Sequence, residues 1–313
     1  MKLFIPIISL MFFFAAVGCK KDNPAAVNPP TDTTKNPPTD SITIFFVINE
    51  LGMRSLRAGE HYQLWLKIAP DTSWKSIKQL IISYTSSEDT AVMVGSLSSS
   101  KALDSIQSAL ISIEQTNTSA TPTFPLLEAH NFIFDHKKLL IASMDHSSAL
   151  GDYSGLQGSL VFTSKSTDSL AYTREFYLMN LAGGMQTASL LSLKPPPEGW
   201  RYGLWAEDTN FSPHEYFFYG LFSTPIGHDS DSSKDFYPFP GGWKPQQMNI
   251  PSGSIIVTLE PLLYGDSLKY KGPSPFTLLN FNRIRFIEKN KNYPMTNVSS
   301  HGLPSGTIIF RKN

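Results

Sequence analysis

Short runs of apolar, β-branched and aromatic residues recur along the chain from residue 41 onward, separated by clusters of Gly, Pro, Asn, Asp and Ser. Runs of this length bounded by turn residues are typical of β-strands. They include residues 41–48, 61–66, 79–84, 139–142, 158–163 and 254–259. The best helical candidate, residues 101–110, is short. The pattern therefore predicts an all-β protein built from sandwiches of short strands.

The first hydrophobic segment is of another kind. Lys2 precedes an apolar run from Leu3 to Val17, and this run is shorter than the about 20 residues needed to cross a bilayer. Ala16-Val17-Gly18-Cys19 resembles the lipobox of bacterial lipoproteins, in which a peptidase cuts before a lipid-modified cysteine. Cys19 is the single cysteine of the chain. We predict that residues 1–18 are a lipoprotein signal peptide and that Cys19 carries the lipid. The alternative is an ordinary signal peptide beside an unmodified cysteine.

Residues 19–40 contain mainly Pro, Asn, Thr, Asp and Lys, with too few apolar residues to pack a core. This composition predicts a disordered tether between the lipid and the folded part. Lys20-Lys21-Asp22 resembles the charged export tag of surface lipoproteins in the Bacteroidota phylum. The resemblance implies an outer-membrane lipoprotein of the cell envelope displayed on the surface, with the periplasmic face as the alternative.

The overall charge is balanced, with 26 basic and 26 acidic residues, and charged residues make up only 17% of the chain. No basic stripe indicates a nucleic-acid partner. No cofactor motif is present either, so the predicted partners are the membrane, through the lipid, and a glycan or an envelope protein.

Five short segments recur in the same order, which indicates an internal repeat. The matched pairs are Phe46–Asn49 with Tyr177–Asn180, Tyr62–Trp65 with Tyr202–Trp205, Val94–Leu97 with Tyr219–Phe222, Leu110–Glu114 with Val257–Glu260, and Pro125–Leu127 with Thr277–Leu279. In the fourth pair, the second segment is one residue shorter than the first. We predict two tandem immunoglobulin-like sandwiches, unit A (41–133) and unit B (173–281). A connector hairpin (134–172) joins them, and a C-terminal extension (282–313) follows. Trp65 and Trp205 are expected at equivalent core positions, with few contacts between the units.

Unit B also carries a family likeness. Residues 199–205 read Gly-Trp-Arg-Tyr-Gly-Leu-Trp, Gly220-Leu221-Phe222 follows, and Thr258-Leu259-Glu260-Pro261 precedes Pro273-Ser274-Pro275. These motifs resemble the extracytoplasmic C-terminal domain of anti-sigma-K factors (the RskA-like domain). The resemblance implies a β-sandwich outside the cytoplasm. It does not imply sigma-factor binding, because no cytoplasmic sigma-binding segment precedes the domain here.

Two loop segments are candidate ligand sites. Phe236, Tyr237, Phe239 and Trp243 lie on a Pro/Gly-rich segment and are candidates for stacking on sugar rings or on a partner, or for covering the sandwich end. Asp229, Asp231 and Asp235 offer three carboxylates for a Ca²⁺ ion, although the EF-hand spacing is absent. A solvated loop is the alternative for these acidic residues.

Other polar groups have plainer interpretations. Glu114 and Glu260 end equivalent strands, and we interpret them as structural hydrogen-bond partners rather than as a catalytic pair. Asp135-His136 and Asp145-His146 lack an accompanying nucleophile or metal motif. Six Asp-Ser/Thr sites resemble the O-glycosylation motif of exported Bacteroidota proteins, but this dipeptide is also common in turns. They begin at Asp32, Asp40, Asp89, Asp104, Asp168 and Asp266.

These observations favour a non-enzymatic envelope lipoprotein that binds a glycan or protein partner, or acts as a spacer. The alternative is a secreted hydrolase of cell-wall or polysaccharide substrates whose active-site residues are scattered along the sequence.

Overall fold

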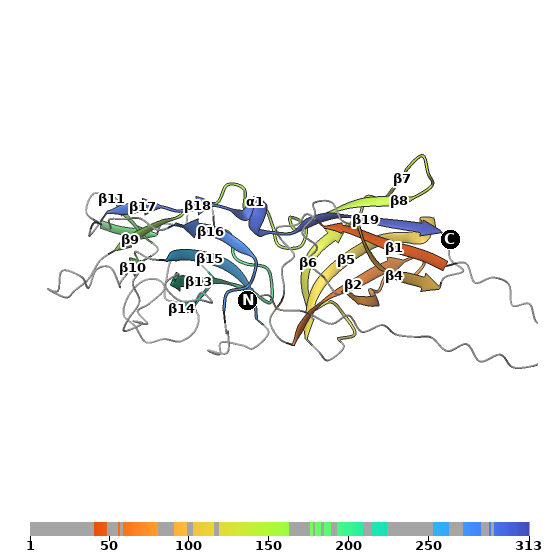
Figure 1. Cartoon of the computed structure of the whole chain (residues 1–313), viewed down its shortest axis with the longest axis horizontal. Coiled ribbons are helices and arrows are strands. Elements are labelled where there is room, and N and C mark those ends of the chain that lie inside the picture. Colours follow the sequence, from red (N-terminus) through yellow and green to blue (C-terminus); the bar gives the residue numbers. More distant parts are fainter. Residues whose placement is uncertain are drawn as a thin grey trace, which may run out of the picture. The chain divides into compact units, whose positions relative to one another are not determined.

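The computed structural model describes much of the chain beyond residue 40, within one compact unit, Thr39–Asn313. The other unit, Met1–Pro38, lies outside the described residues. The described residues are 41–48, 56, 59–80, 91–98, 103–115, 119–162, 176–177, 179–182, 185–188, 193–208, 215–223, 253–262, 272–282, 288 and 291–312. Most of them lie in antiparallel strands (Figure 1), and the helices in this part are the short α1 (Ser299–Gly302) and the 3-10 turn η1 (Leu103–Ser105). The all-β prediction is confirmed.

A nine-stranded antiparallel sheet, here called the first module, takes its strands from both ends of the described chain. The strand order is β3-β2-β5-β6-β8-β19-β1-β4, with β7 paired to β8. The strands are β1 (Ser41–Ile48), β2 (Glu60–Ile68), β3 (Lys75–Leu80), β4 (Ala91–Ser98), β5 (Ile106–Gln115), β6 (Phe124–Ala129), β7 (Ile133–Phe134), β8 (Leu140–Asp145) and β19 (Ser305–Lys312). The last strand, β19, lies between β1 and β8.

Three smaller sheets form the second module. A five-stranded sheet has the order β14-β13-β15-β16-β18, a three-stranded sheet has the order β10-β9-β17, and β11 pairs with β12. The strands are β9 (Ser159–Phe162), β10 (Phe176–Tyr177), β11 (Met179–Ala182), β12 (Met185–Ala188), β13 (Trp200–Asp208), β14 (Glu215–Phe222), β15 (Ser254–Pro261), β16 (Thr277–Phe281), β17 (Asn292–Pro294) and β18 (Thr296–Asn297). Phe162 on β9 contacts Phe281 on β16, with ring centroids 5.7 Å apart, so these two sheets pack on each other.

Four strands of each module are copies of one arrangement, β3-β2-β5-β6 and β14-β13-β15-β16. The register of the central pair is the same in both, with Tyr62–Ile113 and Trp65–Leu110 opposed in the first copy and Tyr202–Leu259 and Trp205–Ile256 in the second. Pairing is interrupted at the same two places, after Leu64 and Ile111 in the first copy and after Leu204 and Val257 in the second. Register fixes which side chains face the core. The two groups of strands therefore share their register and the positions of its irregularities, as the predicted repeat requires.

One predicted match within the repeat is wrong. Val94–Leu97 was expected to correspond to Tyr219–Phe222, but β4 pairs with β1, whereas β14 pairs with β13 as β3 pairs with β2. The counterpart of β14 is therefore β3. The sequence concealed this because β3 is an exposed edge strand, and Lys78 stands where β14 has Gly220. Exposed edge positions do not need the apolar pattern that a buried strand needs.

The two modules exchange strands. In the first module β8 pairs with β19, which also pairs with β1; in the second module β17 pairs with β9, which also pairs with β10. The exchanged strands match in sequence, since residues 306–310 of β19 read Gly-Thr-Ile-Ile-Phe and residues 158–162 at β9 read Gly-Ser-Leu-Val-Phe. Yet β9 follows the first module in the chain and joins the second, while β19 follows the second and joins the first.

The predicted boundaries therefore do not coincide with the sheets. The segment 134–172, expected to be a connector, supplies β8 to the first module and β9 to the second. The segment 282–313, expected to be an extension, supplies β17, β18 and β19. The strands of the second module, β9 to β18, are consecutive in the chain, whereas the first module is complete only with β19, which follows the second module.

The expectation of few contacts between the units is also wrong, because one hydrophobic core runs through both modules. Trp200 is fully buried at this junction, and its ring meets Phe124 and Phe276 edge to face at centroid distances of 6.2 and 5.8 Å. These phenylalanines stand at corresponding positions at the start of β6 and just before β16. Gly199 adopts a φ of 81°, and a Cβ there would lie 3.1 Å from the Phe124 ring. Glycine thus allows the close approach.

Candidate functional site

The residues of both predicted ligand segments lie outside the described residues. This holds for the aromatic residues Phe236, Tyr237, Phe239 and Trp243, for the acidic residues Asp229, Asp231 and Asp235, and for Cys19. In sequence, the two segments fall between β14, which ends at Phe222, and β15, which begins at Ser254, and both strands pair with β13. Across the described ranges, no three His, Cys, Asp or Glu side chains are grouped so that they could hold a metal ion.

The most elaborate polar clusters described are two repeat-related groups around Glu114 and Glu260. Both glutamates are buried, with 3% and 0% of their surface exposed. Glu260 Oε1 accepts hydrogen bonds from Trp205 Nε1 at 2.9 Å, from Thr258 Oγ1 at 2.5 Å and from the Ser274 backbone N–H at 3.0 Å. A buried carboxylate is tolerated where such donors satisfy it.

In the first module, a serine hydroxyl bridges the tryptophan and the glutamate of the corresponding cluster. Trp65 Nε1 donates to Ser112 Oγ at 2.7 Å, and Ser112 Oγ donates to Glu114 Oε1 at 2.5 Å. Thr123 adds two further donors, its backbone N–H and its hydroxyl. Ser112 corresponds to Thr258 of the second module, so a tryptophan, a hydroxyl and a glutamate recur together in both copies.

A glycine explains why only the second cluster has the direct bond from tryptophan to glutamate. An added Cβ at Gly203 would lie 2.7 Å from Glu260 Cγ and 2.8 Å from Trp205 Nε1. The corresponding residue of the first module is Gln63, whose amide donates to Ser76 Oγ instead. The absent side chain at Gly203 thus leaves the space in which Glu260 reaches the indole.

These clusters lie on the outer face of the central strands. Alternate residues of a strand face opposite sides, and Tyr62 and Leu64 face the main core, so Trp65 faces away from it. Trp205 forms a separate small cluster with Leu221 and Ile256, and its ring lies 4.7 Å from that of Phe218. Trp65 and Trp205 are each 1% exposed, so the predicted burial is confirmed, although not within the main core. All donors around the glutamates are used, and the structural interpretation agrees with these contacts.

The loops through which the chain crosses between modules are also built alike. After β8, Asp145 Oδ1 accepts the Ser147 N–H at 2.7 Å; after β18, Asn297 Oδ1 accepts the Ser299 N–H at 3.0 Å. The Ser147 hydroxyl also donates to Asp145 and, together with backbone N–H groups, holds the pKa of that carboxyl below its usual value. The Asp145-His146 pair therefore has a capping role at the first crossing.

Hydrogen bonds join the two crossing loops to each other. The Asn297 amide donates to three backbone carbonyls of the first crossing loop, those of Tyr153, Ser154 and Leu156, at 2.8–3.1 Å. In the first loop, His146 Nδ1 lies 3.1 Å from the carbonyl oxygen of Pro304, just before β19. Sequence reasoning missed this network, although residues 145–148 (Asp-His-Ser-Ser) and 297–300 (Asn-Val-Ser-Ser) are similar.

Two tyrosines are buried beside the first crossing. Tyr202 donates to the Lys194 carbonyl at 2.7 Å and lies 3.4 Å from the hydroxyl of Tyr153, which donates to the Leu150 carbonyl. Burial raises the pKa of both phenols above the ordinary value. They remain neutral hydrogen-bond donors near neutral pH and are suited to fixing loops rather than to proton transfer.

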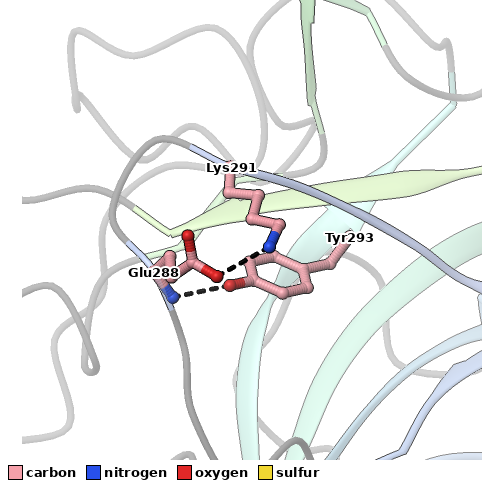
Figure 2. A network of polar contacts seen from close by, with 3 residues as sticks. All are labelled: Glu288, Lys291 and Tyr293. Atoms are coloured by element: carbon pink, nitrogen blue, oxygen red, sulfur yellow. Dashed lines mark hydrogen bonds and ion pairs between the residues drawn. The ribbon is translucent and has the colours of Figure 1, made fainter.

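Figure 2 shows a further polar network, next to β17. Tyr293 Oη accepts the Glu288 backbone N–H at 2.5 Å, and Lys291 Nζ lies 2.6 Å from Glu288 Oε1. The hydrogen bond to Glu288 and the attraction of its charge raise the pKa of Lys291. Both charged side chains are more than half exposed, and exposed ion pairs contribute little to stability, so this pair has at most a small stabilising effect.

In the described part of the chain, no helix has the length and apolar character needed to span a bilayer. In comparisons with known proteins, no family model, no curated protein and no solved structure matches the chain.

Proposed function

We propose that this chain is a lipid-anchored outer-membrane protein of the bacterial cell envelope whose folded part binds a partner or acts as a spacer rather than catalysing a reaction. The observation that carries the proposal is the N-terminal arrangement. An apolar run ends at Gly18-Cys19, the single cysteine of the chain, and a polar segment separates it from the first strand at Ser41. Two or three acyl chains on one cysteine would hold the protein firmly in a membrane.

The proposed fold is a pair of tandem immunoglobulin-like β-sandwiches, the second of which resembles the extracytoplasmic domain of anti-sigma-K factors. The common register of the two four-stranded copies supports a tandem arrangement. The burial and full hydrogen bonding of Glu114 and Glu260 favour a non-catalytic role, because these carboxylates are engaged within the protein.

The proposed partner is a glycan or an envelope protein, bound through the aromatic residues between β14 and β15. Aromatic rings on a Pro/Gly-rich segment lose little conformational entropy on binding and stack well on sugar rings. A hydrolase is the competing function. Turnover in a screen of cell-wall and polysaccharide substrates, abolished by changing a single carboxylate such as Asp231, would replace the binding proposal.

Changing Cys19 to Ser should move the protein from the membrane fraction to the soluble fraction, because the lipid attachment atom is lost. Fractionation of expressing cells after a salt wash measures this. Ala16→Leu, which brings the motif closer to the usual lipobox, should leave the protein in the membrane. Salt-resistant membrane association of the Cys19→Ser protein would contradict the anchor.

A glycan array probed with the chain from residue 19, carrying Cys19→Ser, tests the partner. For any glycan that binds, Trp243→Ala and Tyr237→Ala should each weaken binding about tenfold, the effect of losing one well-packed aromatic contact. Trp74→Ala, which removes a half-buried tryptophan beside Lys67 in the first module, is the matched control and should leave binding unchanged. Equal losses in all three variants would argue against the aromatic segment.

A further inference from the structure

One end of the first module presents an unusual pair of exposed apolar residues. Ile133 and Phe134 on β7 are 67% and 54% exposed, the two highest values for large hydrophobic residues in the part of the chain that the structure describes. They precede the turn between β7 and β8, and this hairpin stands at the upper right in Figure 1. Adjacent exposed apolar residues of this size mark contact sites more often than isolated ones do.

The turn of this hairpin is rigid and holds two lysines at its tip. Asp135 Oδ1 accepts the backbone N–H groups of Lys137 and Leu139 at 2.9 and 2.8 Å. The Lys138 N–H donates to the Asp135 carbonyl at 3.0 Å, and Lys138 adopts a φ of 60°. Both lysine side chains are exposed. These hydrogen bonds order the turn backbone from which both lysine side chains extend, a few residues after Ile133 and Phe134.

Two more cations lie at the same end. Phe310 of β19 is opposite Leu140, the first residue of β8, so Arg311 and Lys312 continue past the start of β8 toward the hairpin tip. Both side chains are exposed, and the Arg311 guanidinium lies over the Phe45 ring at 5.1 Å. Within β1, β19 and residues 130–144, the only carboxylate is that of Asp135, which is engaged in the turn. The exposed side chains of Lys137, Lys138 and Arg311 therefore place positive charge at this end.

This is also the end at which the folded part begins. Ile42 lies opposite Lys312, so the chain enters β1 beside the basic cluster, and Figure 1 shows the first residues of β1, the C-terminal end of β19 and the β7–β8 hairpin at one end of the sheet. If the N-terminal lipid proposed above is present, the anchor and this end are joined by the shortest stretch of chain.

The geometry points to a membrane-contact surface made of Ile133, Phe134, Lys137, Lys138 and Arg311, which docks on an anionic lipid surface. Apolar side chains enter the boundary between headgroups and acyl chains, while neighbouring cations attract anionic headgroups. The surface orients the folded part against the bilayer. The orientation rests on the proposed anchor, but the affinity for lipid does not.

Vesicle sedimentation with the unlipidated chain, residues 19–313 carrying Cys19→Ser, tests the surface. The protein should sediment with vesicles of phosphatidylglycerol and phosphatidylcholine in equal parts and remain in solution with phosphatidylcholine alone. Each basic residue near such a surface contributes about fivefold to the partition coefficient, so K137A/K138A should bind about 25-fold more weakly. Raised salt should weaken wild-type binding.

Two comparisons make the test specific. K78A/K194A removes two exposed lysines elsewhere and should bind as the wild type does. I133S/F134S keeps the charge and should lower binding at least fivefold, while its thermal midpoint stays at the wild-type value because both side chains are exposed. Equal binding to both vesicle types, or equal losses in the two lysine pairs, would overturn the inference. Because the chain carries no lipid here, failure of the anchor in cells would not affect this result.

Discussion

Replacing Trp205 with alanine is expected to lower the free energy of unfolding by about 3–5 kcal/mol, and Trp65→Ala is expected to do the same. Each side chain is 1% exposed, and each indole N–H is bonded to a buried acceptor. The substitution therefore leaves a cavity and also removes a donor from the buried carboxylate cluster. Urea denaturation followed by circular dichroism gives the change in free energy.

Trp74→Ala is the matched control for these two variants. Trp74 lies on the loop after β2, is only half-buried and contacts the Lys67 ammonium at 4.4 Å from the ring centroid. Its loss should cost less than about 1 kcal/mol, as expected of substitutions outside the core. Similar losses at all three positions would show that the Trp–hydroxyl–Glu clusters do not stabilise the fold in the way described.

The shared core changes how these variants should unfold. Trp200 contacts phenylalanines of both modules, and the first module is completed by β19, which follows the second module in the chain. We therefore expect a single transition in every variant, detected alike by fluorescence and circular dichroism. Independent sandwiches would instead show two transitions, with the loss confined to the module that carries the mutation.

The sequence was sufficient to predict the repeat because its most constrained positions survive in both copies. Tyr62 and Tyr202, and likewise Glu114 and Glu260, occupy equivalent buried positions. A buried tryptophan N–H and a buried carboxylate each require a partner, so neither can change without the other. Patterns of this kind are visible in one sequence without any structural information.

The exchange of strands could not be predicted in this way. Residues 158–162 and 306–310 have nearly the same pattern, so either strand is compatible with either module. Local sequence determines that a strand forms and which face it buries, but not which of two equivalent places it occupies. Contacts in the crossing loops stabilise the observed arrangement: the Asn297 amide donates to the carbonyls of Tyr153, Ser154 and Leu156, and His146 Nδ1 lies 3.1 Å from the Pro304 carbonyl oxygen.

The candidate sites were predictable to different degrees. The aromatic segment is recognisable from composition alone, and its role remains a prediction because Phe236 and Trp243 lie outside the described residues. The apolar pair Ile133–Phe134 was missed, because two apolar residues next to a strand resemble core residues in sequence. In the structure, β7 pairs with β8, and both side chains are exposed.

Gly302→Ala should be among the most damaging single substitutions in the protein, with a loss of more than about 3 kcal/mol. Gly302 is the last residue of α1, where the chain leaves the five-stranded sheet to become β19. An added Cβ would overlap the backbone carbonyl oxygen of Thr277 on β16, and a backbone atom cannot move aside as a side-chain end can. Relief would require α1 to separate from β16, which would pull β19 away from β1 and β8.

The repeat supplies the control for this substitution. Gly155 is followed by leucine as Gly302 is, and it precedes the exchanged strand β9, but it is exposed and a Cβ there would meet no atom within 4 Å. Gly155→Ala should therefore change the free energy of unfolding by less than about 0.5 kcal/mol. Because β19 completes the first module from the end of the chain, Gly302→Ala should also speed amide hydrogen exchange in β1, at residues 42–48. Unchanged exchange in β1, alongside a destabilised second module, would mean that the modules are not coupled through the exchanged strand.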